Sequence, residues 1–437
     1  MDQQKVAIFW FRRDLRLEDN VGFTAALQSG LAVLPIFIFD KEILDKLPEE
    51  DARVSFIYNT LQGLRTRLEK ENKRSLGLYY GTPKEVFKEL SATYKIHSVY
   101  TNRDYEPYAQ TRDTQIAAQL EEQGIAFHTY KDQVIFEKDE IVKKDGLPYV
   151  VYTPFKNKWK EQFRSDTMLA SHNSEQYLGA IIESSNLPNV TLEQMGFTPS
   201  RIVVPEYLAT PALIEGYEDT RNFPAIKNGT SKLGPHLRFG TVSIRTMVKK
   251  AIAQKNEVFW SELIWREFFM QILWHFPHTK DKAFKPKYDR IEWRNNEQEF
   301  EKWKTGQTGY ALVDAGMREL NTTGFMHNRV RMLVASFLCK HLLIDWRWGE
   351  AYFAEKLLDY DMSANVGNWQ WAAGSGVDAA PYFRIFNPIT QIQKFDKQLE
   401  YIKKWVPELQ ELTYPAMMVD HKMARERCLK TYKEALA

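Results

Sequence analysis

The sequence predicts an α/β domain followed by an all-α domain. Over roughly the first 130 residues, short apolar runs alternate with amphipathic stretches, which is typical of a doubly wound parallel, Rossmann-like sheet. Beyond Pro205 the apolar residues recur with helical period and strand patterns nearly vanish. The stretch between is irregular, with scattered Pro, Asn and Ser. We therefore expect domains at 1–130 and 206–437, joined by a connector at 131–205.

The first domain is expected to hold five strands with helices between them. The predicted strands are Val6–Phe11, Ala32–Ile38, Leu76–Tyr80, Ser98–Thr101 and Ala126–Thr129. Helical periodicity covers 52–70, 83–94 and 109–122. No Gly-x-Gly-x-x-Gly turn or P-loop is present, so no motif supports dinucleotide or NTP binding in this domain.

The second domain is expected to be helical and rich in tryptophan. Apolar residues at i, i+3 and i+4 spacing predict helices over Val258–His275, Gly309–Asn321, His327–His341 and Trp348–Asp359. Nine of the 12 tryptophans fall between Trp260 and Trp371, within this domain.

Composition excludes several classes of protein. Of the 437 residues, 44% are hydrophobic and 27% charged, as in soluble globular proteins. The longest apolar run, Leu31–Phe39, is interrupted by Pro35 and is too short to span a membrane. The N-terminus enters Val6–Trp10 directly, without a signal-peptide pattern. Because Cys339 and Cys428 are the only cysteines, no disulfide framework or thiolate metal site is expected, and a reducing cytoplasm fits.

Basic residues are concentrated after the connector. Arg221 to Asn256 contains eight basic residues and no acidic one. Six more follow at Lys280, Lys282, Lys285, Lys287, Arg290 and Arg294. This pattern suits either a solvated basic face or a surface that contacts phosphates.

The stretch from Asp359 to Pro388 has an unusual composition. Two carboxylates, an amide and two indoles lie within the 13 residues 359–371, and Arg384 follows among aromatic residues. Buried carboxylates, amides and indole N–H groups each need a partner. A large, flat guest with polar edges would supply those partners, and a flavin is the obvious candidate.

Two predicted helices combine polar and aromatic residues. In the first, Glu262, Trp265 and Phe269 lie on one face, so that a base could stack on the ring while the acid bonds its edge. An amphipathic core helix explains the same pattern. In the second, Asn328 and Met332 are i, i+4 partners, either lining a polar pocket or packing in the core.

Two further patterns each allow two interpretations, and a third argues against metal and acyl-transfer chemistry. Trp293, Trp346 and Trp369 lie in three predicted helical segments, where they could form an electron relay or simply pack in the core. The segment Gly229–Gly234 leads into a helix and suits either a phosphate site or an N-cap. The histidines are too isolated for a zinc site, and no acyl-transfer triad is visible, so no metal is expected.

Taken together, these motifs resemble the photolyase/cryptochrome family over essentially the whole chain. The opening Trp10–Asn20 is similar to the family's N-terminal signature. The later motifs follow in family order: Thr230-Ser-x-Leu233, Trp265-Arg-Glu-Phe268, Gly306-x-Thr-Gly-Tyr310-x-x-Val-Asp314, Gly324-x-Met-His-Asn328-Arg and Asn365-x-x-x-Trp369-Gln-Trp371.

The resemblance implies an N-terminal α/β antenna domain and a C-terminal helical domain that binds FAD. By similarity, the ribityl-phosphate side of FAD would contact Tyr217, Thr230, Ser231, Lys232, Leu233 and Gly234. Asp359, paired with Arg331, and Asp361 would flank the isoalloxazine, and Asn365 would lie at flavin N5. The electron-transfer chain would be Trp369, Trp346 and Trp293.

The closest subtype is the class I enzyme that splits cyclobutane pyrimidine dimers (CPDs) in DNA. Its lesion pocket is matched by Glu262, Trp265, Asn328, Arg329, Met332 and Trp371, with catalytic roles for Glu262, Asn328, Met332 and Asn365. Further DNA contacts would come from Arg221, Arg266, Arg384 and Gln391. A (6-4) photolyase would place a histidine within Asn328–Met332, and signalling cryptochromes usually add a C-terminal tail. Both remain alternatives, the second as a blue-light receptor acting through a partner protein.

The resemblance also bears on cofactors and setting. FAD would be reduced in the active form. A second, antenna chromophore of folate or deazaflavin type is left open, because Tyr108-Ala109 stands where folate-binding relatives carry Asn-Glu. Near the FAD phosphates, Gly234 stands where relatives often carry Ser, so one hydroxyl is missing there. The expected partner is UV-damaged DNA and no membrane. The expected protein is a cytoplasmic monomer of bacterial type, associated with the nucleoid when bound to DNA.

Overall fold

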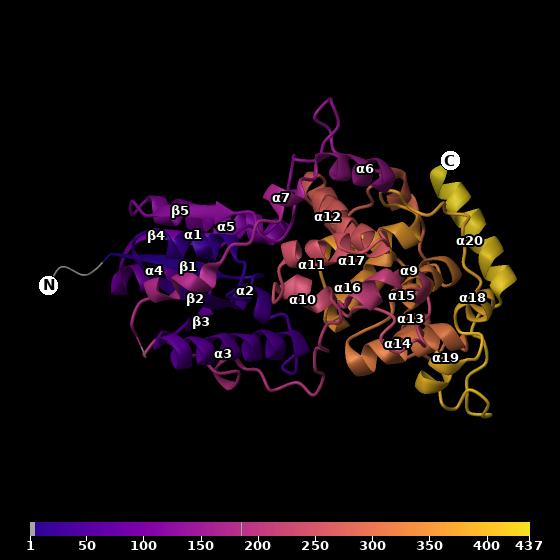
Figure 1. Cartoon of the computed structure of the whole chain (residues 1–437). Coiled ribbons are helices and arrows are strands. Elements are labelled where there is room, and N and C mark those ends of the chain that lie inside the picture. Colours follow the sequence, from indigo (N-terminus) through magenta and orange to yellow (C-terminus); the bar gives the residue numbers. More distant parts are fainter. Residues whose placement is uncertain (1–4, 185) are drawn as a thin grey trace. The chain divides into compact units, whose positions relative to one another are not determined.

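The computed structural model describes residues 5–184 and 186–437, which fold into two compact units (Figure 1). Unit 1 comprises Met1–Glu137, Gln162–Pro205 and Leu233–Lys250. Unit 2 comprises Lys138–Glu161, Glu206–Lys232 and Ala251–Ala437. The expected connector 131–205 thus contributes to both units, and residues 233–250 fold with the sheet-containing unit.

Unit 1 contains a five-stranded parallel sheet in the order β3-β2-β1-β4-β5. Its strands are β1 (Lys5–Phe11), β2 (Ala32–Asp40), β3 (Gly77–Gly81), β4 (Lys95–Asn102) and β5 (Ala126–Tyr130). All five predicted strands are present. Strand β2 runs to Asp40, beyond its predicted end, because Phe39 and Asp40 still pair with Tyr80 and Gly81 of β3.

Both faces of the sheet are covered, as expected for a doubly wound fold. Alternate residues of β1 point to opposite faces. One face packs in a cluster that includes Ala7, Phe9, Phe11, Phe23 and Leu61. The other face packs in a cluster that includes Val6, Ile8, Trp10, Phe87 and Leu120.

The helices of unit 1 include the three predicted between strands. The helices are α1 (Val21–Leu27), α2 (Lys41–Leu44), α3 (Ala52–Asn72), α4 (Pro83–Thr93), α5 (Pro107–Glu121), α7 (Ser165–Met168), η1 (Ser174–Ala180), η2 (Glu193–Met195), α10 (Gly234–Phe239) and α11 (Ile244–Ile252), whose last two residues lie in unit 2. Helix α1, which the periodicity did not reveal, has only seven residues.

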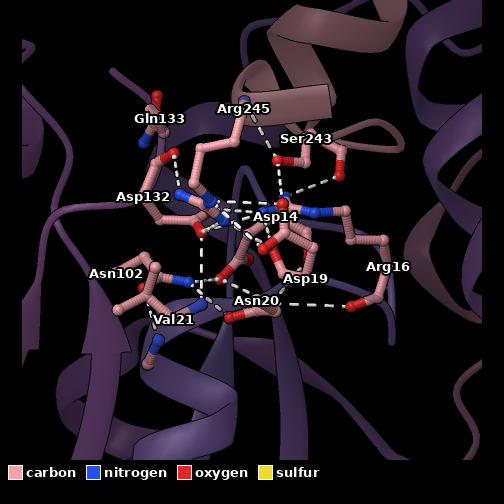
Figure 2. A network of polar contacts seen from close by, with 12 residues as sticks. Asp14, Arg16, Asp19, Asn20, Val21, Asn102, Asp132, Gln133, Ser243 and Arg245 are labelled. Atoms are coloured by element: carbon pink, nitrogen blue, oxygen red, sulfur yellow. Dashed lines mark hydrogen bonds and ion pairs between the residues drawn. The ribbon is translucent and has the colours of Figure 1, made fainter. Parts of the chain in front are cut away.

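A buried polar network closes the carboxyl end of the sheet between β1 and β4 (Figure 2). Asp132 accepts hydrogen bonds from Arg16 Nη2 at 2.7 and 2.8 Å and from Arg245 Nη2 at 2.9 Å. It also accepts the N–H of Val21 at 3.2 Å, at the start of α1. Although burial opposes it, the two guanidinium groups lower the pKa of Asp132 to about 2. The Asp132 carboxylate is therefore ionised, and both of its oxygens accept hydrogen bonds.

Among the described residues of unit 2, the regular secondary structure is helical apart from one isolated β-bridge between Val142 and Pro148. The helices are α6 (Tyr152–Gln162, its last residue in unit 1), α8 (Pro211–Glu215), α9 (Tyr217–Thr220), α12 (Val258–His275), η3 (Pro277–Lys280), η4 (Pro286–Arg290), α13 (Glu297–Lys304), α14 (Ala311–Thr323), α15 (Asn328–Ser336), η5 (Phe337–His341), α16 (Trp346–Lys356), α17 (Met362–Ala373), α18 (Pro388–Phe395), α19 (Glu400–Trp405) and α20 (His421–Leu436).

The helix predictions for unit 2 hold with local corrections. Helix α12 has the predicted bounds. The helix predicted over His327–His341 is α-helical only to Ser336 and continues as the π-helical turn η5. Trp293 was expected in a helical segment, but it lies in the non-helical stretch between η4 and α13, where Arg294 N–H bonds the Leu343 carbonyl at 2.7 Å. That backbone bond replaces a helical one.

The helices and the two cysteines bear on membrane insertion and on disulfides. Among the described residues, no helix is both long and apolar enough to cross a bilayer. Cys339 and Cys428 are buried and free.

Candidate functional site

Helix α17 connects the two groups of predicted site residues. It packs against α12, α15 and α16 in unit 2. Its first turns carry the residues expected near the flavin, and its last turn carries Trp369 and Trp371. Helix α17 can pack closely against its neighbours because two glycines leave room for aromatic rings. A Cβ on Gly349 of α16 would come within 2.1 Å of the Trp369 ring, and one on Gly367 within 2.3 Å of Phe269.

Arg331 and Asp359 form the expected pair. Two parallel hydrogen bonds join the Arg331 guanidinium to the Asp359 carboxylate, at 3.1 and 3.0 Å. Arg331 Nε also donates to the Met326 carbonyl at 2.7 Å. A bidentate ion pair of this kind fixes both side chains, so Asp359 presents an oriented negative charge.

Asp361 begins α17 as its N-cap. Its Oδ1 accepts the N–H groups of Ser363 and Ala364 at 3.1 and 3.3 Å, and the Ser363 hydroxyl as well. The carboxylate satisfies N–H groups that have no partner within the helix, and its negative charge interacts favourably with the positive end of the helix dipole. Asp361 thereby sets the direction of the helix that carries Asn365.

Asn365 is buried, and its amide is oriented by Glu350. The Asn365 Nδ2 group donates to the Glu350 main-chain carbonyl at 3.1 Å and to its Oε1 at 2.9 Å. Burial raises the pKa of Glu350. With both N–H bonds committed, the Asn365 carbonyl oxygen is the group left to accept an N–H from a ligand.

Lys232 lies in a partly desolvated, mixed-charge environment. Its Nζ is 3.2 Å from the centroid of the Phe325 ring. Burial lowers the pKa of Lys232 to about 8, although the buried Glu319 acts in the opposite direction. The backbone of Lys232 has a positive φ of 54°. A lysine held this way carries a charge that an anionic ligand would stabilise.

His327 was not among the predicted site residues, although it lies within the Gly324–Arg329 motif. Its Nδ1 accepts the Arg329 N–H at 3.1 Å and caps α15. Burial and the nearby Lys232 and Arg331 lower the pKa of His327 to about 3, so the ring is neutral with its proton on Nε2. That buried Nε2 has no partner among the described residues. An unpaired buried donor is costly, and it is what a polar ligand would satisfy.

The remaining residues assigned to FAD fall on both sides of the unit boundary. Tyr217, Thr230 and Ser231 belong to unit 2, as Lys232 does, whereas Leu233 and Gly234 belong to unit 1 by the division of the chain. Helix α10 begins at Gly234 after an N-cap at Leu233 that has no side-chain cap bond. The simple N-cap explanation for the Gly229–Gly234 segment therefore loses support.

Glu262 and Arg221 were assigned to different parts of the DNA, but the structure pairs them. Arg221 Nη1 lies 2.5 Å from Glu262 Oε1. The Arg221 guanidinium also lies 5.7 Å from the Tyr217 ring centroid. The carboxylate expected to bond a base edge is thus paired with the arginine expected to hold a phosphate.

Three arginines from separate elements form a basic group. Arg329 Nη2 donates to Asn222 Oδ1 at 2.5 Å, and its guanidinium lies 4.4 Å from the Phe395 ring centroid. Burial lowers the pKa of Arg329, and the charges of Arg221 and Arg384 lower it further. The charges of Arg221 and Arg384 thus act on Arg329, and a concentration of positive charge is what a phosphate-binding surface requires.

The other residues assigned to DNA are at or near the surface. Arg329 Nη1 also contacts the Met332 sulfur at 3.7 Å. Asn328 is exposed. Arg266, Trp371 and Gln391 are partly buried, with Trp371 6.5 Å from Phe386 and Arg384 5.8 Å from the same ring. Trp265 is partly exposed and stacks on a residue that was not predicted, Tyr152.

The three relay tryptophans belong to one hydrophobic cluster. Trp346 and Trp369 are each 2% exposed in its core, and Trp293 packs against it. Trp303, which was not predicted, also lies in this core, with its ring centroid 6.2 Å from that of Trp369. Trp293 is 6.0 Å from Tyr432 of α20. Core packing and electron transfer are compatible roles for these indoles.

The segment that bears on an antenna chromophore is occupied by internal bonds. Tyr108 donates to Asp40 at 2.5 Å and Tyr105 to Glu137 at 2.6 Å, while Ala109 is buried.

Among the described residues, no group of three or more His, Cys, Asp or Glu could hold a metal.

The sheet is parallel, with the strand order 3-2-1-4-5. The helical unit holds oriented carboxylates, a fixed amide, an unpaired buried donor and a group of basic and aromatic side chains. These features are typical of a cofactor-dependent protein that can contact a polyanion. Family comparison gives the same class in more detail. Residues 7–174 match the DNA photolyase model, and residues 259–413 match the FAD binding domain of DNA photolyase. A deoxyribodipyrimidine photo-lyase of a Synechococcus strain is 38% identical, covering 98% of this chain and 97% of the relative. The chain therefore belongs to the DNA photolyase family.

Solved structures agree over the full length. A bacterial class III photolyase from Agrobacterium tumefaciens has a TM-score of 0.89 at 34% identity, covering 100% of this chain and 98% of its own. An archaeal photolyase from Sulfolobus tokodaii with two FAD molecules has a TM-score of 0.84 at 35% identity, covering 98% and 100%. A Synechocystis cryptochrome is also similar, with a TM-score of 0.83 at 26% identity, covering 99% and 100%.

Proposed function

We propose that this chain is a deoxyribodipyrimidine photo-lyase that uses FAD and light to split cyclobutane pyrimidine dimers in DNA. The observation that carries the proposal is the arrangement along α17. The oriented acids and the Asn365 amide lie at its beginning, and Trp371 lies at its end within a helical unit that also holds the basic group. One helix thus forms the wall between a cofactor and a lesion. Relatives of that name, about as long as this chain, support it.

The chain's own residues would bind and orient the cofactor. Asp359, held by Arg331, and Asp361 would flank the ring system, and the Asn365 carbonyl would accept an N–H from it. Lys232 and the unpaired His327 N–H would meet anionic or polar groups of the nucleotide. Bound FAD in its reduced form would supply, on absorbing light, an electron that opens the cyclobutane ring and then returns to the flavin.

A second set of residues would hold the DNA. Arg221, Arg329 and Arg384 would bind phosphates beside the lesion, helped by Arg266 and Gln391. The dimer would be flipped out of the duplex into the pocket, because an enzyme cannot reach a base that is still stacked in the helix; photolyases are among the enzymes that flip bases. Trp265 and Trp371 would stack on it, and Glu262 and Asn328 would bond its polar edges, with Met332 alongside.

Binding must rearrange the pair between Glu262 and Arg221. The two groups are 2.5 Å apart, so a phosphate that attracts Arg221 competes with Glu262 for it. We expect Arg221 to turn toward the phosphate as Glu262 turns toward the base edge. Recognition of the backbone and of the lesion are then coupled.

The proposal is tested by illuminating the reduced protein with three duplexes: one with a CPD, one with a (6-4) photoproduct and one undamaged. Restored pyrimidines are measured by chromatography. Repair of the CPD alone is expected. Repair of the (6-4) product instead would assign the chain to the other repair enzyme, and repair of neither would favour a photoreceptor.

We also propose where and in what form the protein acts. No membrane-spanning helix is found among the described residues, and DNA is the proposed partner. We propose a cytoplasmic monomer that associates with the nucleoid when bound to DNA. Sedimentation at micromolar concentration with and without a damaged duplex tests the monomer; a dimer in both conditions would contradict it.

A further inference from the structure

Tyr152 lies in direct contact with the proposed lesion pocket. It is the first residue of α6, in the stretch expected to be a connector, and it is 6% exposed. Its ring is stacked on the indole of Trp265, with 3.5 Å between centroids and 8° between planes. This is the shortest and most nearly parallel aromatic contact that Trp265 makes, since its contacts with Phe268 and Phe269 have centroids 5.5 Å apart.

Tyr152 is held in place independently of this stack. Its hydroxyl donates to the Ser261 carbonyl at 2.7 Å, one turn before Trp265 on α12. Its N–H donates to Asp378 Oδ2 at 3.2 Å. Two turns further along α6, Trp159 Nε1 donates to the buried Glu267 of α12 at 2.6 Å. The Tyr152 ring is therefore anchored at its hydroxyl, at its backbone and through its helix.

The environment of the Tyr152 hydroxyl connects it with the rest of the pocket. Burial raises the pKa of Tyr152, and the nearby Glu262 carboxylate raises it further. The phenol stays protonated and remains a donor to Ser261. Tyr152 thus lies close to Glu262 as well as against Trp265.

From this geometry we infer that Tyr152 is a positioning residue for dimer recognition. It covers one face of the Trp265 indole and fixes its plane, so that the part of the ring still exposed is presented in one orientation. A stacking platform fixed before binding loses less side-chain entropy when a base arrives. Tyr152 does not touch the dimer; it acts through Trp265. The inference rests on the proposed function.

The test compares three variants with the wild-type, FAD-loaded protein. Tyr152→Leu removes the planar ring, whereas Tyr152→Phe keeps the ring and removes only the hydroxyl. Phe155→Leu is the matched control, because Phe155 is 2% exposed on the same helix and packs 5.3 Å from Phe268. Dissociation constants are measured for a CPD duplex and for the same duplex undamaged, together with Tm and the repair yield at saturating substrate.

Tyr152→Leu should weaken CPD binding about three- to tenfold, the range expected for losing one aromatic pair. Binding to undamaged DNA and repair at saturation should stay at wild-type values. Tyr152→Phe should retain most of the CPD affinity. Phe155→Leu should lower Tm without changing the ratio of the two dissociation constants. If Tyr152→Leu does not fold, Tyr152→Met, whose unbranched side chain adapts to irregular space and has no planar ring, takes its place.

Two results would overturn the inference: an unchanged CPD preference in Tyr152→Leu, or an equal loss in Phe155→Leu. Failure of the proposed function is distinguishable, because the wild-type protein itself would then show no preference for the CPD duplex. A double-mutant cycle with Trp265→Leu gives an independent check. Once Trp265 is absent, Tyr152→Leu should have little further effect on CPD binding.

Discussion

At the scale of single residues, Lys340 is a buried cation held by carbonyl groups. It is 1% exposed, and its Nζ donates to the carbonyls of Ala373 at 3.0 Å and Tyr382 at 3.2 Å. Its Nζ also lies 4.0 Å from the centroid of the Tyr432 ring. None of its described contacts is with a carboxylate. Burial lowers the pKa of Lys340 to about 8.

Lys340 should make stability depend on pH. In the unfolded chain a lysine has a pKa of about 10.4. Between pH 8 and 10.4 the unfolded state therefore binds more protons, so the free energy of unfolding contributed by Lys340 rises with pH, by up to about 3 kcal/mol. Lys340→Met should lack this rise. Urea unfolding of both proteins at pH 7.5 and 9.5 measures it.

The exposed Lys422 provides the control for this measurement. Lys422→Met should show the same dependence on pH as the wild-type protein. A difference between wild type and Lys340→Met that is the same at both pH values would contradict the assignment.

At the scale of elements, α17 shows how a cap can serve a site. Asp361 accepts two N–H groups of its first turn, and Gly374 ends the helix with a φ of 90°. Between these ends the helix carries Asn365 in its first turn and Trp369 and Trp371 in its second half. A change in the cap therefore reaches every functional side chain on the helix.

Asp361→Ala should lower the free energy of unfolding by about 0.5–2 kcal/mol, because the first N–H groups lose their acceptor. It should also weaken FAD binding, measured by the flavin released on dilution. Asp361→Asn restores a capping oxygen and should recover most of the stability. Asp420→Ala is the matched control, since Asp420 caps α20. It should lower stability similarly and leave FAD binding unchanged; equal flavin loss in both variants would refute the link.

Periodicity predicts the elements here better than it predicts their contacts. Strands β1 to β5 and helix α12 follow from alternating and helical patterns that local sequence determines. Trp293 departs from a helix because the N–H of the next residue, Arg294, bonds the carbonyl of Leu343, which lies far away in the sequence. Tyr152 was hidden in an irregular stretch for the same reason: its importance comes from Trp265, and no local pattern records that partner.

At the scale of the molecule, the proposed relay makes use of the core of unit 2. Trp346 and Trp369 are interior residues of the same cluster that stabilises the helices. Motif order could suggest the three tryptophans, but the place of Trp303 beside Trp369 depends on tertiary packing. Two buried indoles, Trp346 and Trp303, are therefore candidates for the step beyond Trp369.

Trp346→Phe should stop light-driven reduction of oxidised FAD, because phenylalanine is far harder to oxidise than tryptophan. Repair by enzyme reduced beforehand should be spared. Absorbance of the flavin during illumination, with an external electron donor present, measures the first, and CPD repair measures the second. Trp303→Phe is the control from the same core. If it blocks reduction and Trp346→Phe does not, electrons pass through Trp303 instead.

The network around Asp132 has a consequence for how the two units depend on nucleotides. Folds with a doubly wound sheet usually bind ligands where the strand order reverses, which is between β1 and β4 in this chain. Here the Asp132 carboxylate takes the hydrogen bonds that a phosphate would receive from Arg16, Arg245 and the start of α1 (Figure 2). Because the Asp132 carboxylate is part of the chain, it cannot dissociate from these donors as a bound phosphate would. By mass action, unit 1 should then gain no stability from a nucleotide at this position, whereas the stability of unit 2 should rise with the logarithm of the free FAD concentration.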